Sequence, residues 1–165
     1  MSHAEDLQRL LVRELEAFRR EIALFPNDEM LWLDAPGITN PAGNLALHVA
    51  GNLQHFIGAG LGGTHYVRNR DAEFSTRSGT RGDVDLELQA AILAVTATLG
   101  TLDDAAFQAP MPSAPNGMVA RTGIFLLHLV AHTAFHLGQA GYLRRILTGD
   151  ATSAGPMPMR PLVDQ

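Results

Sequence analysis

The sequence predicts an all-α protein, a four-helix bundle with a long connection between its second and third helices. Apolar residues recur at steps of three and four in four separate segments, a spacing that places them on one face of a helix. Glycine, proline and polar clusters separate those segments, and no pair of alternating runs flanks a hairpin turn. Four amphipathic helices that share one core are the simplest assembly with this pattern.

The first helix is predicted to begin after Ser2 and to end before Pro26. Ser2 and Glu5 have the spacing of a capping box, in which each side chain accepts a hydrogen bond from the other residue's backbone. Apolar residues from Leu7 to Phe25 follow the helical period. Pro26 ends the helix because proline has no amide hydrogen to donate.

The second helix is predicted to run from Asn40 and Pro41 to about Ile57. Asparagine caps the free amides at a helix start, and proline is tolerated at the first helical position. Residues 27–40 form the connector before it, with one short helical turn at residues 31–32. The apolar side chains of that turn are expected to cover one end of the bundle.

Residues 64–82 are predicted to be a long loop, because a cluster of glycines ends the second helix and mostly polar residues follow. Loops of this length are typical of crossovers, binding lids or disordered segments. Asp83 is predicted to cap the third helix, which has a broad apolar face and ends at Gly100.

The fourth helix, residues 118–147, is predicted to be the longest and to end at Gly149. The loop before it, residues 101–117, contains three prolines, which exclude the interior of a helix. Residues 1–149 are therefore expected to form a single domain. Residues 150–165 are rich in proline and glycine and are expected to form an extended or disordered tail.

The composition excludes several classes of site. The 165 residues contain no cysteine, which excludes disulfides, thiolate metal sites and cysteine nucleophiles. All 12 basic residues are arginine, which excludes the lysine of a P-loop and Schiff-base chemistry. The net charge of -5 gives no electrostatic reason to expect nucleic acid or an anionic membrane as a partner.

The chain is expected to be a soluble protein of the cytoplasm. No run reaches the roughly 18 apolar residues that crossing a bilayer requires. The acidic N-terminus differs from a signal peptide, which has a basic start and an apolar run. Nucleic acid and membrane are therefore not expected as partners.

Three histidines in the predicted fourth helix are the most unusual feature of the chain. His128, His132 and His136 lie four residues apart, and each step of four turns the side chain by only about 40° around the helix axis. The three side chains therefore share one face. The neighbours of the histidines on this face are Ile124, Phe135 and Gln139. They predict that the face points into the bundle.

The second helix offers further histidines on one side. His48 and His55 are seven residues apart, which is two helical turns, and Asn52 lies between them. A histidine on this side can face the fourth helix.

One interpretation of these histidines is a metal site made of His48 and one adjacent pair on the fourth helix. Neutral imidazoles bind divalent cations at about 2.0–2.1 Å, and three protein ligands leave room for water or substrate. Spacing does not choose between the pair His128 and His132 and the pair His132 and His136, so only His132 is common to both. The alternative interpretation is that the rings are hydrogen-bonded core or surface residues without a metal.

Residues 68–73 form a charged segment within the predicted loop. Its arginines could bind an anionic group of a substrate, and its carboxylates could act as a base. A solvated loop with local ion pairs explains the same residues.

Three runs of the sequence carry a family resemblance: residues 43–53, residues 68–74 and residues 132–139. The most specific piece is a His-x-x-x-His pair followed directly by x-Gly-Gln, with one earlier histidine on the second helix. Together these runs resemble the DinB-like superfamily of metal-binding four-helix bundles.

The resemblance implies a ligand set for the metal. It selects His48, His132 and His136 as ligands of a divalent ion, zinc or nickel, and leaves His128 as a neighbour. It also implies a homodimer, and a long connection between the second and third helices. Some relatives are thiol-dependent transferases or isomerases that use low-molecular-weight thiols. Leu137 departs from the arginine that many members carry at that position.

The leading hypothesis is a divalent-metal-dependent enzyme that acts on a small molecule through an open three-histidine site. The reaction would be a thiol-dependent transfer or isomerisation, or a hydrolysis. No catalytic residue is assigned, although Asp71 or Glu73 could approach the ion if the loop folds over the bundle. One alternative is a non-catalytic metal-binding or small-molecule-binding module of a stress response. Another is a metal-free dimeric scaffold with a histidine-lined cavity.

Overall fold

The computed structural model describes residues 2–163, and over that range it is helical and has no strand, which confirms the all-α class. Residue 1, from the predicted domain, and residues 164–165, from the predicted tail, lie outside the described residues. No helix in the described range combines the length and the apolar character that a membrane span requires. The α-helices are α1 (His3–Ala23), α2 (Ala42–Leu53), α3 (Arg70–Ser75), α4 (Arg81–Leu99), α5 (Asp104–Gln108) and α6 (Thr122–Thr148).

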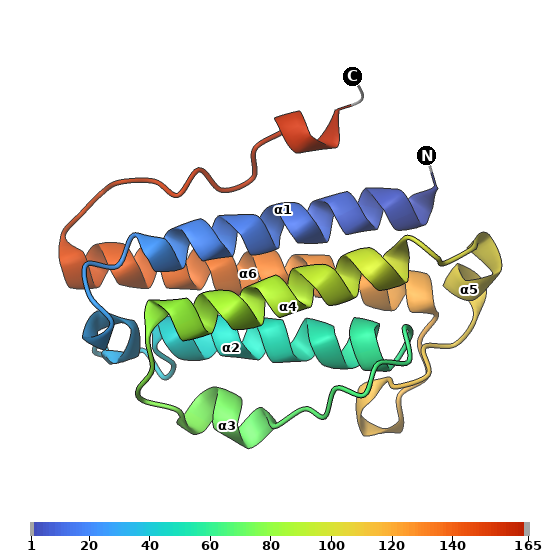
Figure 1. Ribbon diagram of the computed structural model, residues 1–165, viewed down its shortest axis with the longest axis horizontal. Coiled ribbons are helices and arrows are strands. Elements are labelled where there is room, and N and C mark those ends of the chain that lie inside the picture. Colours follow the sequence, from blue (N-terminus) through green and yellow to red (C-terminus); the bar gives the residue numbers. More distant parts are fainter. Residues whose placement is uncertain (1, 164–165) are drawn as a thin grey trace.

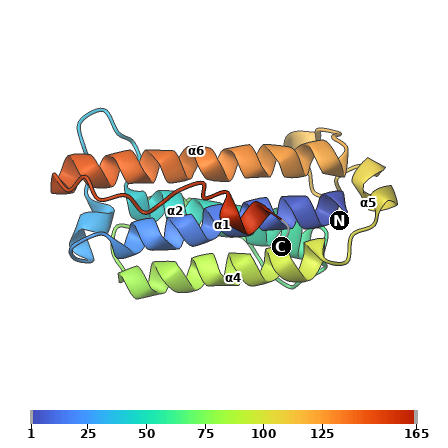
Figure 2. The ribbon, with the colours of Figure 1, turned by 90° about the horizontal axis from the view of Figure 1, so that it is seen from above.

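Four long helices, α1, α2, α4 and α6, lie side by side (Figures 1 and 2). Helices α1 and α2 each pack against both α4 and α6, and α2 runs antiparallel to α6 (Figure 1). The core between them consists of aliphatic and aromatic side chains, and removing such apolar surface from water is the main driving force of folding. Its most buried members include Leu11, Phe18, Leu53, Leu88 and Leu126.

The start of α1 confirms the predicted capping box. The Ser2 hydroxyl accepts a hydrogen bond from the Glu5 amide, and the Glu5 carboxylate accepts one from the Ser2 amide. The helix ends at Ala23, three residues before Pro26. The helical turn predicted in the connector is also confirmed, as the 3₁₀ helix Glu29–Trp32.

Helix α2 differs from its prediction at both ends. Pro41 occupies the N-cap position, so the start is one residue later than expected and Asn40 is not the cap. At the other end, the backbone continues as a π-helical segment, Gln54–Ala59, instead of ending near Ile57. Gly58 allows this segment to approach α4, because a Cβ atom there would lie 3.2 Å from Ala94 Cβ.

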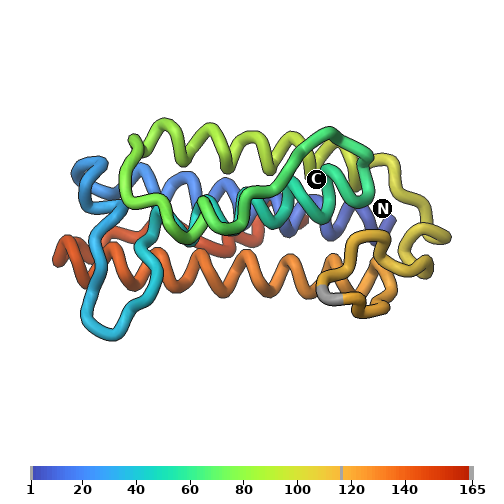
Figure 3. Tube along the Cα trace, turned by 90° about the horizontal axis from the view of Figure 1, so that it is seen from below, coloured from blue at the N-terminus to red at the C-terminus, as the bar shows by residue number. Residues whose placement is uncertain are grey.

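The segment predicted as a loop at residues 64–82 contains α3, a helix of 6 residues that the sequence analysis missed. The Asn69 side chain caps it by accepting a hydrogen bond from the Ala72 amide. Helix α3 packs on α2, and the connection passes across α2 (Figure 3). The prediction that Asp83 caps α4 is wrong. Thr80 caps the helix, and Asp83 is its third residue and the partner of Thr80 in a capping box.

The loop predicted at residues 101–117 also contains a short helix, α5, followed by the 3₁₀ turn Pro115–Gly117. Helix α6 begins at Thr122, four residues later than predicted. It ends at Gly149, whose φ of 70° is the left-handed conformation that glycine adopts without strain.

The C-terminal segment runs back along α1 (Figures 1 and 2). The Arg20 side chain donates hydrogen bonds to the backbone carbonyls of Ala154 and Gly155. Arg144, which is fully buried, pairs with Glu21 of α1 and donates to the Asp150 carbonyl. The described part of the tail is therefore extended and held on the helices, with a 3₁₀ turn at Arg160–Leu162.

Candidate metal centre

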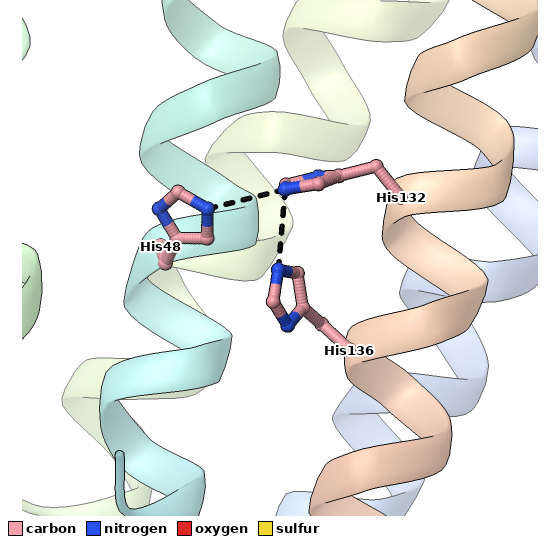
Figure 4. Close-up of side chains that lie close together, drawn as sticks. All are labelled: His48, His132 and His136. Atoms are coloured by element: carbon pink, nitrogen blue, oxygen red, sulfur yellow. Dashed lines mark hydrogen bonds between the residues drawn. The ribbon is translucent and has the colours of Figure 1, made fainter. Parts of the chain in front are cut away.

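Three histidine side chains converge between α2 and α6 (Figure 4). His48 comes from the middle of α2, and His132 and His136 come from adjacent turns of α6. The Nε2 atom of His132 lies 3.2 Å from His48 Nε2 and 3.1 Å from His136 Nε2. One ligand atom of each residue lies within 4.8 Å of the other two. The structure thus brings together the three residues that the family resemblance selected.

The outer nitrogen of His48 is held by a carboxylate. His48 Nδ1 lies 2.9 Å from Glu73 Oε2, and Arg68 donates to both oxygens of the same carboxylate at 2.7 Å. Burial raises the pKa of the Glu73 carboxyl, but the hydrogen bonds from Arg68 and His48 outweigh it and hold the pKa below its usual value. His48 Nδ1 also lies 3.2 Å from Arg68 Nη2, which can only donate, but the shorter contact is with the carboxylate, which only accepts. The shorter contact favours the tautomer with the proton on His48 Nδ1 and the lone pair on Nε2.

The outer nitrogen of His136 is held in a similar way by an amide. His136 Nδ1 lies 2.7 Å from Gln139 Oε1, three residues further along α6. The amide oxygen is an acceptor, so His136 donates from Nδ1 and presents an unprotonated Nε2 to the cluster. Burial lowers the pKa of His136, although the hydrogen bond with Gln139 opposes that shift.

His132 is the central member of the cluster. Its pKa is lowered to about 3, first by burial and then by the neighbouring histidines and Arg68. His132 is therefore neutral near pH 7, which is the form that binds a metal through a nitrogen lone pair. Within residues 2–163, its buried Nδ1 atom has no hydrogen-bond partner.

This donor set fits a divalent cation. Two imidazole nitrogens that bind one tetrahedral zinc ion at about 2.0–2.1 Å lie about 3.3 Å apart, close to the separations found here. His48 and His136 both direct lone pairs at His132 Nε2, and a single N–H on that atom can satisfy only one of them. A shared cation satisfies all three nitrogens.

The other histidines of the predicted region lie outside this cluster. His128 is exposed, with its ring centroid 5.9 Å from that of His132. His55 lies in the π-helical segment and is half-buried, and its pKa is lowered by burial and by Arg68. Neither belongs to the group of converging ligand atoms.

The prediction that the histidine face and its neighbours point into the bundle is wrong for all three neighbours. Ile124 and Phe135 are 54% and 62% exposed, and Gln139 is exposed as well. The core face of α6 instead carries Leu129, Thr133 and Leu137, each one residue after a histidine. One residue corresponds to a turn of about 100° around the helix, so the histidines lie at the edge of the contact between α2 and α6.

The two carboxylates considered in the loop have different positions. Glu73 is buried in α3 and contacts the outer nitrogen of His48, not the centre of the cluster. Asp71 lies two residues before Glu73, which places it on the opposite side of α3, and it is exposed. The structure therefore gives Glu73 an orienting position behind a ligand.

Two residues of the site were not assigned their structural roles from sequence. Arg68 holds Glu73, rather than standing free to bind a substrate anion, and Gln139 orients His136. The spacing of Gln139, three residues after His136 on the same helix, was the available signal, because such residues are neighbours on a helix surface. No spacing signal existed for Arg68, because its contact depends on how the connection folds back on α2.

Comparison with known proteins identifies the family. No curated protein matches the chain. The family model of the DinB superfamily matches residues 10–140, a range that includes α2, α3, α4 and all three converging histidines. On this match, the chain belongs to the DinB superfamily.

Proposed function

We propose that the protein is a cytoplasmic, divalent-metal-dependent enzyme that acts on a small molecule at His48, His132 and His136. The observation that carries this proposal is the convergence of three Nε2 atoms from two helices, two of them with the opposite nitrogen already held. Zinc or nickel suits such a set of neutral imidazoles. The favoured reactions are transfer or isomerisation that depends on a low-molecular-weight thiol, and hydrolysis.

The residues of the chain have distinct parts in this proposal. The three imidazoles bind the ion and, as only three ligands, leave a coordination position for a small molecule. Glu73 and Gln139 fix the rings of His48 and His136 by accepting their Nδ1 protons. The bound ion would supply Lewis-acid chemistry, polarising a sulfur or oxygen of the small molecule and favouring loss of its proton.

Aromatic side chains lie beside two of the three histidines. The centroid of the Phe74 ring from α3 lies 4.6 Å from that of the His48 ring, and the Arg70 guanidinium lies 4.9 Å from the centroid of the same Phe74 ring. The Phe135 ring from α6 lies 5.3 Å from the His136 ring and is exposed. An apolar part of a substrate would pack between such rings, while its polar end reaches the histidines.

A second candidate is a non-catalytic metal-binding module, which is favoured because the ligands come from two different helices. Because His48 belongs to α2 and both other ligands belong to α6, a bound ion cross-links two helices. Such a cross-link stabilises the folded chain whether or not turnover occurs. Only an assay of turnover separates this module from the enzyme.

We also propose that the four long helices act as one four-helix bundle and that the chain forms a homodimer through α6. Exposed apolar side chains lie along this helix at Ile124, Leu127, Phe135, Tyr142 and Ile146. Exposed apolar patches of this kind are typical of interaction surfaces. A groove of about 540 Å³ lies between residues 37–40 and the same face of α6, and a second copy would close it beside the metal centre.

The proposal is tested by the metal content of untagged protein. Wild-type protein and the control variant His3→Ala are expected to contain about one zinc or nickel ion per chain. His132→Ala is expected to lose the metal, because its Nε2 atom lies between the other two ligands. Equal metal content in His132→Ala and wild type would contradict the site. Thiol-transfer assays with and without chelator then separate the enzyme from the binding module.

A further inference from the structure

Two buried polar atoms on facing helices have no hydrogen-bond partner and are of types that can hydrogen-bond to each other. The side-chain oxygen of Asn52 on α2 and the Nδ1 atom of His132 on α6 both lack a hydrogen-bond partner among the residues the structure describes. Buried polar atoms are nearly always paired, so an unpaired atom calls for a specific explanation. Here two occur in the same interface between helices.

The contacts on either side place Asn52 opposite the turn of α6 that precedes His132. Asn52 lies one turn after His48, whose Nε2 atom is 3.2 Å from His132 Nε2. One turn further, the Phe56 ring lies 5.0 Å from the Phe125 ring of α6. Because α2 and α6 are antiparallel (Figure 1), these two contacts imply that Asn52 faces the stretch of α6 between Phe125 and His132.

The direction of the His132 side chain favours the same pairing. Side chains of an α-helix lean toward its N-terminus, so His132 leans toward the turn of α6 that Asn52 faces. Asn52 is only 8% exposed, which leaves little access for bulk water to its amide oxygen. The helix geometry therefore points to one stretch of the interface between α2 and α6 for both unpaired atoms.

The chemistry of the pair depends on which nitrogen of His132 carries the proton. An imidazole that binds a cation through Nε2 carries its remaining proton on Nδ1, which is then a donor. The amide oxygen of Asn52 is an acceptor. Each of the other two ligands already has such an acceptor, Glu73 for His48 and Gln139 for His136.

We propose that Asn52 is the positioning residue of His132, with its side-chain oxygen accepting the Nδ1 proton when a cation is bound. This inference rests on the metal site of the proposed function. It completes a set in which every ligand has its own acceptor. In the protein without metal, no hydrogen bond joins the two, which accounts for two of the buried unpaired atoms of the described residues, Asn52 Oδ1 and His132 Nδ1.

The test compares zinc affinity with the stability of the metal-free protein. Asn52→Leu is expected to bind zinc about 10–100-fold more weakly in a competition with a chromophoric chelator. Its metal-free form is expected to unfold at the same or a higher urea concentration than wild type, because an unpaired buried polar atom has been removed. Asn52→Asp retains an acceptor at the same place and is expected to bind zinc at least as tightly as wild type.

The matched control is Gln54→Leu, two residues further along the chain at the start of the π-helical segment. Gln54 is buried and donates to Glu87 of α4, and it does not contact the three converging histidines. This variant is expected to lose stability without losing zinc affinity, the reverse of Asn52→Leu. A structural role alone for Asn52 would make the two variants alike.

A second readout needs no variant. In zinc-loaded wild type, the nitrogen NMR spectrum is expected to show a protonated His132 Nδ1 that exchanges slowly with solvent. Equal zinc affinity of Asn52→Leu and wild type, or an Nδ1 proton in rapid exchange with solvent, would overturn the inference. Absence of zinc from wild type would instead overturn the proposed function.

Discussion

At the scale of single residues, the site depends on groups that hold the ligands as well as on the ligands. His48 is oriented by Glu73, and Glu73 is held in turn by Arg68. The space for that carboxylate is provided by Gly51 of α2, because a Cβ atom there would overlap Glu73 Oε1. Gly51 therefore affects the geometry of the ligand His48, although glycine has no side chain that could bind a metal.

Gly51→Ala is expected to weaken zinc binding by about 10–100-fold, because Glu73 must move and His48 loses its acceptor. The same crowding is expected to lower the free energy of unfolding by about 1–3 kcal/mol. Both quantities can be measured on one preparation, by chelator competition and by urea unfolding.

The control for this prediction is Gly138→Ala in α6. A Cβ atom at Gly138 meets nothing within 4 Å, so no ligand has to move. Its zinc affinity is expected to equal that of wild type. If Gly51→Ala also binds zinc like wild type, Glu73 does not orient His48 in the way described.

The sequence could predict the candidate ligands but not their partners. His128, His132 and His136 are equivalent by helical spacing, and the family resemblance was needed to prefer the latter two. In the structure the preference has a local cause, because His136 has Gln139 beside it while His128 is exposed. Glu73 was a candidate beside Asp71, and only the packing of α3 on α2 separates a buried carboxylate from an exposed one.

At the scale of elements, strong local signals were predictable and short elements were not. Ser2 and Glu5 specify the start of α1 by themselves, because a capping box involves only two residues that lie three positions apart in the sequence. Helices α3 and α5 have 6 and 5 residues, too short for a hydrophobic period to be visible. Such helices are too short to be stable alone and depend on tertiary packing.

The contact between α1 and α4 includes an ion pair that should depend on pH. Arg19 donates to both oxygens of Asp85, at 2.6 and 3.0 Å. The hydrogen bonds from Arg19 outweigh burial and hold the pKa of Asp85 below its usual value. A carboxyl with a depressed pKa in the folded state stabilises the fold above the unfolded pKa, and this contribution is lost as pH falls through the folded pKa.

Asp85→Asn is therefore expected to lower the free energy of unfolding at pH 7 by about 0.5–1 kcal/mol, a small value because the pair is partly exposed. Below the folded-state pKa of Asp85, the variant and wild type are expected to be equally stable. Urea unfolding at a series of pH values measures this difference. A difference that stays constant down to the acid limit would show that the charge of Asp85 is not its cause.

Removing one partner of the pair of Arg144 and Glu21 should cost much more, because both side chains are buried and the remaining charge would have no partner. Arg144→Met leaves the Glu21 carboxylate without its cation and is expected to lower the free energy of unfolding by about 3–5 kcal/mol. It also removes the donor to the Asp150 carbonyl, so the C-terminal segment should become sensitive to protease at neutral pH. Unchanged stability and unchanged cleavage would contradict this role of Arg144.

At the scale of the whole molecule, the face of α6 that carries apolar side chains adjoins the metal centre. Phe135 contacts His136, and Tyr142 and Ile146 continue the exposed apolar surface toward the end of the helix. If a second copy covers this face, Tyr142→Glu is expected to convert dimer to monomer, because a buried unpaired carboxylate is costly. Analytical ultracentrifugation measures the change.

The control for the dimer is Leu93→Glu on α4, where the side chain is 70% exposed and lies outside the α6 face. It is expected to leave the mass of the assembly unchanged. A monomeric wild type, or a Tyr142→Glu variant that remains dimeric, would contradict an interface on α6.

The most direct measurement is the position of the metal in crystals of untagged protein grown with zinc, found by anomalous diffraction at the zinc absorption edge. The account predicts a single strong peak between α2 and α6, about 2.0–2.1 Å from the Nε2 atoms of His48, His132 and His136. A peak bound elsewhere, or no peak at zinc concentrations that saturate binding in solution, would contradict the central claim.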